Sequence, residues 1–264
     1  MIEGPERSES YARSTMPGNR WELGWGIVRD NLGKLFGLNL LMLLFFIPVI
    51  ALFVIRYVNI QYQAVVFPFS GNIGLGYPAV SDTAGFAETI YYMVDRNTFM
   101  MLPVAGIIAS IGIAGGMYVM RNMVWAEGVF VGRDFWSGVK KNFLNVFLCT
   151  LFYTILMFIG VLSIRMGNLM NASSGEKWYI TLSVILSYVF LTFFTIVYLF
   201  SLTLGVTYKL KFRNLIKNSF IMAIGLLPLN LFFALFAFVS LLLIVIGGIF
   251  MMLGFMIFIL FGFS

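Results

Sequence analysis

The sequence contains no histidine and a single cysteine, Cys149. Without histidine the chain lacks the commonest metal ligand and the commonest general base, so Ser-His and Cys-His catalytic arrangements are excluded. A lone cysteine excludes a disulfide within the chain. These absences argue against a hydrolytic or metal-dependent enzyme, and we expect a non-enzymatic protein with no cofactor, no metal site and no catalytic residues.

Charged residues are also scarce. They make up 11% of the chain, whereas hydrophobic residues make up 61%. Soluble domains carry about 25% charged residues and about 45–50% apolar ones. A chain of this composition cannot cover itself with polar surface in water, so we predict an integral membrane protein whose main partner is membrane lipid.

The apolar runs predict an all-α fold, a polytopic transmembrane helix bundle of about six spans arranged as three hairpins. The last 46 residues contain no charge, and at about 1.5 Å per residue they are long enough for two spans. Five spans followed by a re-entrant or interfacial tail after Gly248 is the alternative. The six predicted spans are Leu35–Ile55, Phe99–Met120, Leu144–Ile164, Tyr179–Leu204, Phe220–Ile244 and Phe250–Phe263.

A short amphipathic pattern precedes three of these spans. Each copy has an aromatic residue, an aliphatic residue three positions later and an asparagine three positions after that. Tryptophan on an apolar helix face opposite charged residues is typical of helices in the headgroup layer. We therefore predict a cytoplasmic interfacial helix before each hairpin. The copies begin at Trp25, Trp136 and Phe212 and end at Asn31, Asn142 and Asn218.

The distribution of lysine and arginine predicts the orientation. Thirteen of the 17 basic residues fall on the side of the bundle that holds the N-terminus, which is cytoplasmic by the positive-inside rule. We expect a disordered cytoplasmic tail over residues 1–20, a single transmembrane domain over residues 21–264 and an extracellular loop over residues 56–98. The net charge of +6 then faces lipid headgroups, and no nucleic-acid partner is needed.

Three groups of side chains are candidate sites. Small residues at steps of four, three and four along the second span let helix backbones approach closely. Polar residues of the fourth span form either interhelical hydrogen bonds or a lining for a neutral solute. Aromatic and charged residues between the second and third spans either anchor the chain in the interface or dock a partner. In that order, the groups are Ala105, Ala109, Gly112 and Gly116; Ser187, Tyr188, Thr192, Thr195 and Tyr198; and Trp125, Arg133, Asp134 and Trp136.

Three blocks in order resemble the YesL-like family of bacterial membrane proteins, a domain of unknown function. They are Met117-Tyr118-x-x-Arg121-Asn122, then Asp134-Phe135-Trp136-x-x-x-Lys140-x-Asn142-Phe143, and later Lys217-Asn218-(x)4-Ala223-(x)3-Leu227-Pro228. Such proteins are similar to ones encoded beside ABC importers for oligosaccharides. The resemblance implies no catalytic or binding residues.

Two functions follow as expectations. The resemblance implies a non-enzymatic accessory or regulatory subunit of a carbohydrate ABC importer in a bacterial plasma membrane, with ABC permease subunits as partners. The alternative is a stand-alone permease or channel for a neutral solute, lined by the fourth span. No Asp, Glu, Lys or Arg lies deep in a predicted span, which argues against proton-coupled transport.

Overall fold

The computed structural model describes residues 20–70, 84–125, 128–208 and 210–228. The elements in these ranges are all helices, and the four long ones, α2 to α5, are apolar enough to cross a membrane. The chain is therefore a multi-pass membrane protein, as its composition predicts. The helices are α2 (Arg20–Ser70), α3 (Phe86–Val124), α4 (Val131–Ser174), α5 (Trp178–Thr207) and α6 (Phe212–Gly225).

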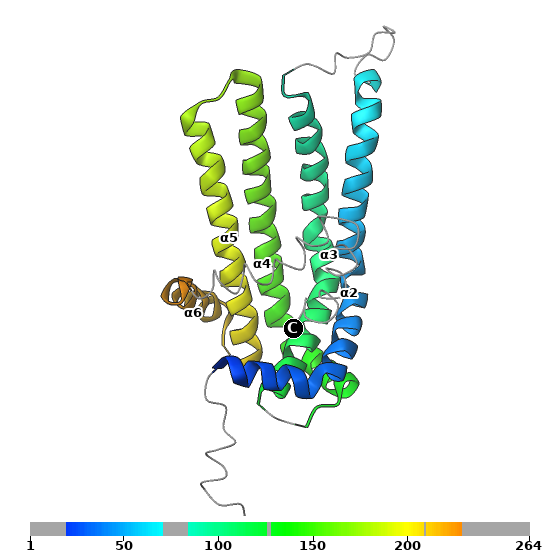
Figure 1. Cartoon of the computed structure of the whole chain (residues 1–264), viewed down its shortest axis with the longest axis vertical. Coiled ribbons are helices and arrows are strands. Elements are labelled where there is room, and N and C mark those ends of the chain that lie inside the picture. Colours follow the sequence, from blue (N-terminus) through cyan, green and yellow to red (C-terminus); the bar gives the residue numbers. More distant parts are fainter. Residues whose placement is uncertain (1–19, 71–83, 126–127, 209, 229–264) are drawn as a thin grey trace, which may run out of the picture.

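The four long helices stand side by side in chain order, and α6 lies across the lower part of α5 (Figure 1). The interface between α3 and α4 is the largest, and α2 and α5 pack on either side of that pair. We call the end of the bundle where α3 stops and α4 starts the α3–α4 end. The opposite end, where α4 stops and α5 starts, is the α4–α5 end.

The helices are longer than the predicted spans. The segment expected to be a loop, residues 56–98, is helical over Arg56–Ser70 and again from Phe86 onward. The helix ends were predicted too early because a charged residue ends an apolar run without ending a helix, and the position of residues 56–98 outside the membrane stays a prediction. Backbone hydrogen bonds continue equally well outside the hydrocarbon layer.

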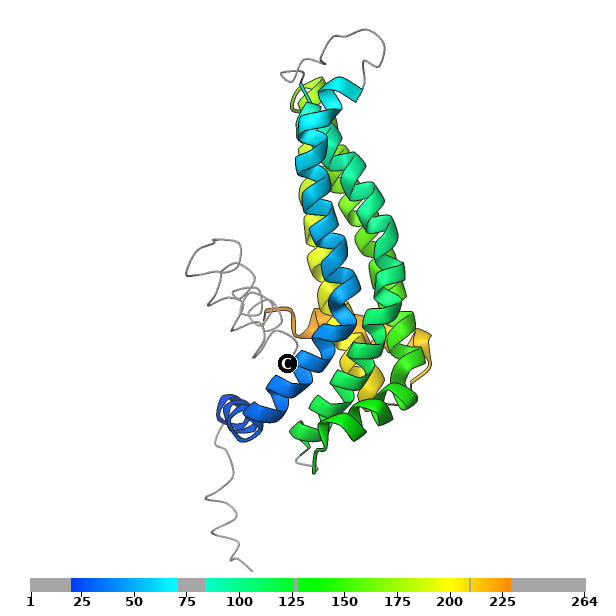
Figure 2. The same ribbon diagram turned by 90° about the vertical axis from the view of Figure 1, so that its right-hand side faces the viewer.

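The first two predicted interfacial helices are continuous with the spans that follow them. The segment that begins at Trp25 is the first part of α2, and the segment that begins at Trp136 is the first part of α4. Figure 2 shows the start of α2 turned away from the axis of its span. The third segment forms the separate helix α6. The predicted sixth span, Phe250–Phe263, and the part of the predicted fifth span, Phe220–Ile244, from residue 229 onward lie outside the described residues.

Small residues on two faces of α3 bring its neighbours close. On one face, a Cβ at Gly112 would lie 2.9 Å from the Cβ of Phe45 in α2. On another, the ring of Phe135 in α4 occupies the space beside Gly115. Within the predicted stripe, Gly112 and Gly116 pack against Phe45 and Met42 of α2 in the same chain. Ala105, Ala109, Gly112 and Gly116 are all buried and offer no free face to a permease.

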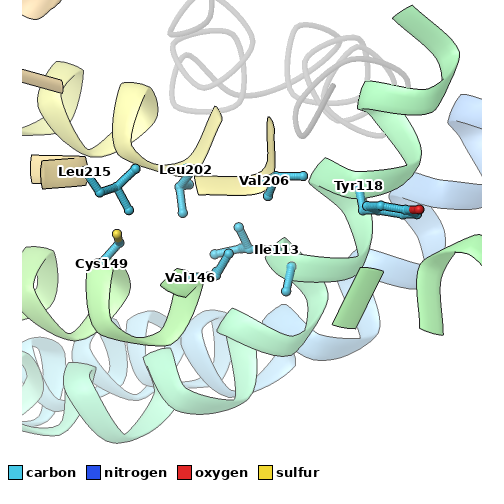
Figure 3. Packing of buried hydrophobic residues seen from close by; sticks show 8 residues of the cluster. Ile113, Tyr118, Val146, Cys149, Leu202, Val206 and Leu215 are labelled. Atoms are coloured by element: carbon cyan, nitrogen blue, oxygen red, sulfur yellow. The ribbon is translucent and has the colours of Figure 1, made fainter. Parts of the chain in front are cut away.

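A buried apolar cluster joins the four helices α3, α4, α5 and α6 near the α3–α4 end. Figure 3 shows most of its side chains between facing helices, with the ring of Tyr118 at one edge and turned away from the others. Leu215 of α6 is fully buried in this cluster, which attaches the short helix to the bundle. The other members include Ile113, Tyr118, Val146, Cys149, Leu202 and Val206.

Gly138 gives a test of this close packing. A Cβ there would overlap the Cβ of Tyr118 and lie 3.1 Å from the carbonyl oxygen of Ala114, and neither atom can rotate away. We expect Gly138→Ala to destabilise the protein by about 1–3 kcal/mol, measured as a lower apparent Tm in detergent.

Gly37→Ala is the matched control, because nothing lies within 4 Å of the Cβ it would add. Alanine favours a helix over glycine by about 0.5–1 kcal/mol, so this variant should melt at the same temperature or slightly higher. Equal effects of the two substitutions would show that α3 and α4 are not in close contact at Gly138.

Candidate functional site

A buried carboxylate lies where three helices meet. Asp95 of α3 is completely buried, and it pairs with Arg56 of α2 and Arg165 of α4. Arg56 donates to both carboxylate oxygens, with an Nη2–Oδ2 distance of 3.2 Å. Arg165 donates through Nε at 2.5 Å from Oδ2. We call these three residues the Asp95 cluster.

The two arginines are only partly withdrawn from solvent. Their side chains are 23% and 28% exposed, and the guanidinium of Arg165 lies 5.1 Å from the ring centre of Tyr91. A buried carboxylate without a cation would be strongly unfavourable. Here the Asp95 carboxylate is paired with two arginines, and the Asp95 cluster as a whole carries one net positive charge.

Sequence reasoning missed the Asp95 cluster because it assigned all three residues to loops. Arg56 directly follows the first predicted span, Arg165 directly follows the third, and Asp95 precedes the second by four residues. The available signal was the placement of two arginines and one aspartate within a few residues of three span ends that lie on the same side of the predicted bundle. They meet because the helices continue past these positions.

The predicted docking residues separate into two roles. Asp134 is buried, and its carboxylate accepts a hydrogen bond from the backbone N–H of Phe130 at 2.8 Å and a weaker one from Arg133 at 3.3 Å. An acidic residue in the first turn of α4 favours that helix start. Asp134 is therefore structural. Trp125, Arg133 and Trp136 are exposed at the α3–α4 end and remain open to a partner.

The predicted polar lining of α5 is also divided. Thr195 and Tyr198 face α4, where their hydroxyls lie 2.9 Å from Tyr153 Oη and 3.0 Å from Thr150 Oγ1. The rings of Tyr153 and Tyr198 stack with their centres 4.3 Å apart. These residues form interhelical contacts of the kind common in membrane bundles.

Of the other three residues of that set, Ser187 lies on the same side of the helix about three turns before Tyr198, whereas Tyr188 and Thr192 are exposed. Ser187 and Thr192 donate hydrogen bonds to carbonyl oxygens of their own helix, and the side chain of Tyr188 is exposed. The five residues therefore do not form one continuous polar stripe.

Two hollows adjoin α5. The one beside Tyr153 and Tyr198 has a volume of about 10 Å³, far below the roughly 300–1,000 Å³ of ligand pockets. The other, about 630 Å³, is an open depression at the α4–α5 end, lined in part by Tyr92, Met170 and Tyr179. Within the described ranges no cluster of three or more His, Cys, Asp or Glu side chains could hold a metal.

Comparisons with protein-family models, with curated proteins and with solved structures find no match to this chain. The resemblance to the YesL-like family therefore stays a prediction.

The Asp95 cluster predicts a large effect of one substitution. Asp95→Asn removes the carboxylate and leaves two facing guanidinium groups without their anion. Breaking a buried ion pair in this way lowers the free energy of unfolding by about 3–5 kcal/mol. Because both arginines are partly exposed, we expect a loss near the lower end of this range. The measurement is the apparent Tm in detergent.

Two further variants make the test specific. Arg165→Gln should cost less than Asp95→Asn, because Asp95 keeps its contact with Arg56. Asp30→Asn, at an exposed position of α2, should leave the Tm unchanged. If Asp95→Asn and Asp30→Asn behave alike, the cluster does not stabilise the bundle.

Proposed function

We propose that this protein is a non-enzymatic membrane subunit that assists a carbohydrate ABC importer in a bacterial plasma membrane. The importer as partner comes from the family resemblance described above. What supports an accessory role is an exposed surface at the α3–α4 end, formed by Trp125, Phe130, Arg133 and Trp136. We call this surface the aromatic patch.

The aromatic patch is the observation that carries the proposal. Trp125, Phe130 and Trp136 are 54%, 66% and 53% exposed, and the guanidinium of Arg133 lies 4.8 Å from the ring centre of Phe130. Tryptophan and arginine are enriched among residues that dominate binding at protein interfaces. Headgroup anchoring also uses tryptophan, so the experiment below separates a protein partner from lipid.

A stand-alone permease or channel for a neutral solute is the second candidate. The open depression at the α4–α5 end, about 630 Å³ in volume, favours it. Against it, the polar residues of α5 divide between the α4 interface and the helix's own carbonyls. An accessory role does not need a continuous polar path, so we prefer it.

The proposal places the N-terminus and the aromatic patch in the cytoplasm. A membrane-impermeant maleimide tests this, because the natural Cys149 is buried and the unmodified protein should stay unlabelled. Lys177→Cys, exposed at the α4–α5 end, should be labelled on intact cells. Lys140→Cys, exposed at the α3–α4 end, should be labelled only after permeabilisation. The reverse pattern would invert the orientation.

The docking role predicts the outcome of copurification. Tagged protein extracted in mild detergent should bring down ABC permease subunits identified by mass spectrometry. Trp136→Ala and Arg133→Ala should each lower this recovery by about tenfold, the effect of losing roughly 1.4 kcal/mol at an interface.

Trp178→Ala is the matched control. Trp178 is the most exposed tryptophan of the described residues, but it lies at the α4–α5 end. Its substitution should leave recovery unchanged. If no permease subunit is recovered and reconstituted vesicles leak sugar, the permease function replaces the accessory one. If Trp136→Ala and Arg133→Ala recover as much partner as the unmodified protein, the patch is only an anchor.

A further inference from the structure

A second cationic cluster lies at the α3–α4 end, around the ring of Tyr118. Arg121 of α3 places its guanidinium 4.4 Å from the ring centre, and Lys141 of α4 places its ammonium 4.8 Å from it. Lys141 also donates a hydrogen bond to the Tyr118 hydroxyl at 2.8 Å. One aromatic ring thus holds two positive charges from two helices.

The contacts of Arg121 are with neutral groups. Nη1 donates to the Val206 carbonyl oxygen at 3.2 Å, and Nη2 donates to Asn122 Oδ1 at 3.0 Å. The guanidinium also lies 4.9 Å from the ring centre of Trp125. Its Nε is buried and has no acceptor among the described atoms. A guanidinium usually pairs with an anion when it is withdrawn from water.

The balance of charge differs from that of the Asp95 cluster. Two arginines there share one carboxylate, whereas the ion pairs found among the described residues include neither Arg121 nor Lys141. Val206 lies in the last turn of α5, whose carbonyl end supplies about half a negative charge. Among the described residues, most of the two positive charges is therefore left without a counter-ion.

We infer that Tyr118, Arg121 and Lys141 form a binding site for a phosphate group. Phosphate matches the site because its several acceptor oxygens suit a guanidinium and an ammonium together.

The surroundings of the site fit a ligand at headgroup depth. The side chains of Lys141 and Trp125 are exposed, so the site opens to the surface of the α3–α4 end. Tryptophan is typical of the membrane–water interface. The phosphate can belong to an anionic phospholipid or to a soluble molecule, and the experiment separates these two sources.

Native mass spectrometry of the full chain in detergent tests the site, with phosphatidylglycerol and phosphatidylcholine added at equal concentration. The unmodified protein should retain phosphatidylglycerol preferentially. Lys141→Gln should lower that retention about fivefold, the usual effect of one basic residue near an anionic surface. Lys140→Gln, at the exposed neighbouring position, is the matched control and should change it little.

Further arms identify the source of the phosphate and the role of Arg121. If excess inorganic phosphate, but not chloride, displaces phosphatidylglycerol from the unmodified protein, the site takes soluble phosphate as well as lipid. Retention that is insensitive to inorganic phosphate assigns the site to lipid. Arg121→Gln should abolish the preference wherever that variant folds, and Lys141→Gln provides the test if it does not.

Two results would overturn the inference. Equal losses in Lys141→Gln and Lys140→Gln would mean that diffuse surface charge attracts the lipid and that no site exists. Glu127 lies outside the described residues, so Glu127→Gln tests whether this carboxylate is an internal counter-ion. The unmodified protein would then show no preference for phosphatidylglycerol, and Glu127→Gln would create a preference that Lys141→Gln removes. In that case the counter-ion is Glu127 and not a phosphate.

Discussion

The whole arrangement depends on how closely α3 approaches the helices on either side of it. In lipid there is no hydrophobic force between helices, so their association relies on van der Waals packing and polar contacts. Gly112 brings α3 against α2, and Gly115 and Gly138 bring α3 and α4 together. The Asp95 cluster adds ion pairs that join the same three helices. Of the remaining helices, α5 attaches to this unit mainly through α4, and α6 packs mainly on α5.

Composition and apolar runs were enough to predict the membrane class and the four spans that the structure describes. They also predicted that the stripe Ala105 to Gly116 packs a helix. They could not identify α2 as the partner, because spacing on one helix carries no information about its neighbour. The ends of the first three spans were set too early, since the prediction stopped each of them directly before a charged residue, as at Arg56.

The candidate site was harder to predict than the fold. Asp95 and Arg165 are 70 residues apart in the chain, and only the three-dimensional arrangement shows that they pair. Likewise Asp134 and Trp136 belong to the same motif, yet Asp134 is buried at the helix start and Trp136 is exposed. The sequence motif alone predicts the same docking role for Asp134 and Trp136. The exposure of each side chain depends on which way the start of α4 turns toward α3.

The continuity of α4 has a mechanical consequence. One unbroken helix of 44 residues, about 66 Å long, carries Arg133 in its first turn, Trp136 shortly after it and Arg165 nine residues before its end. A helix resists twisting about its axis, so α4 tends to rotate as one rigid rod. A rotation of its first turn would therefore be passed along the helix toward the guanidinium of Arg165.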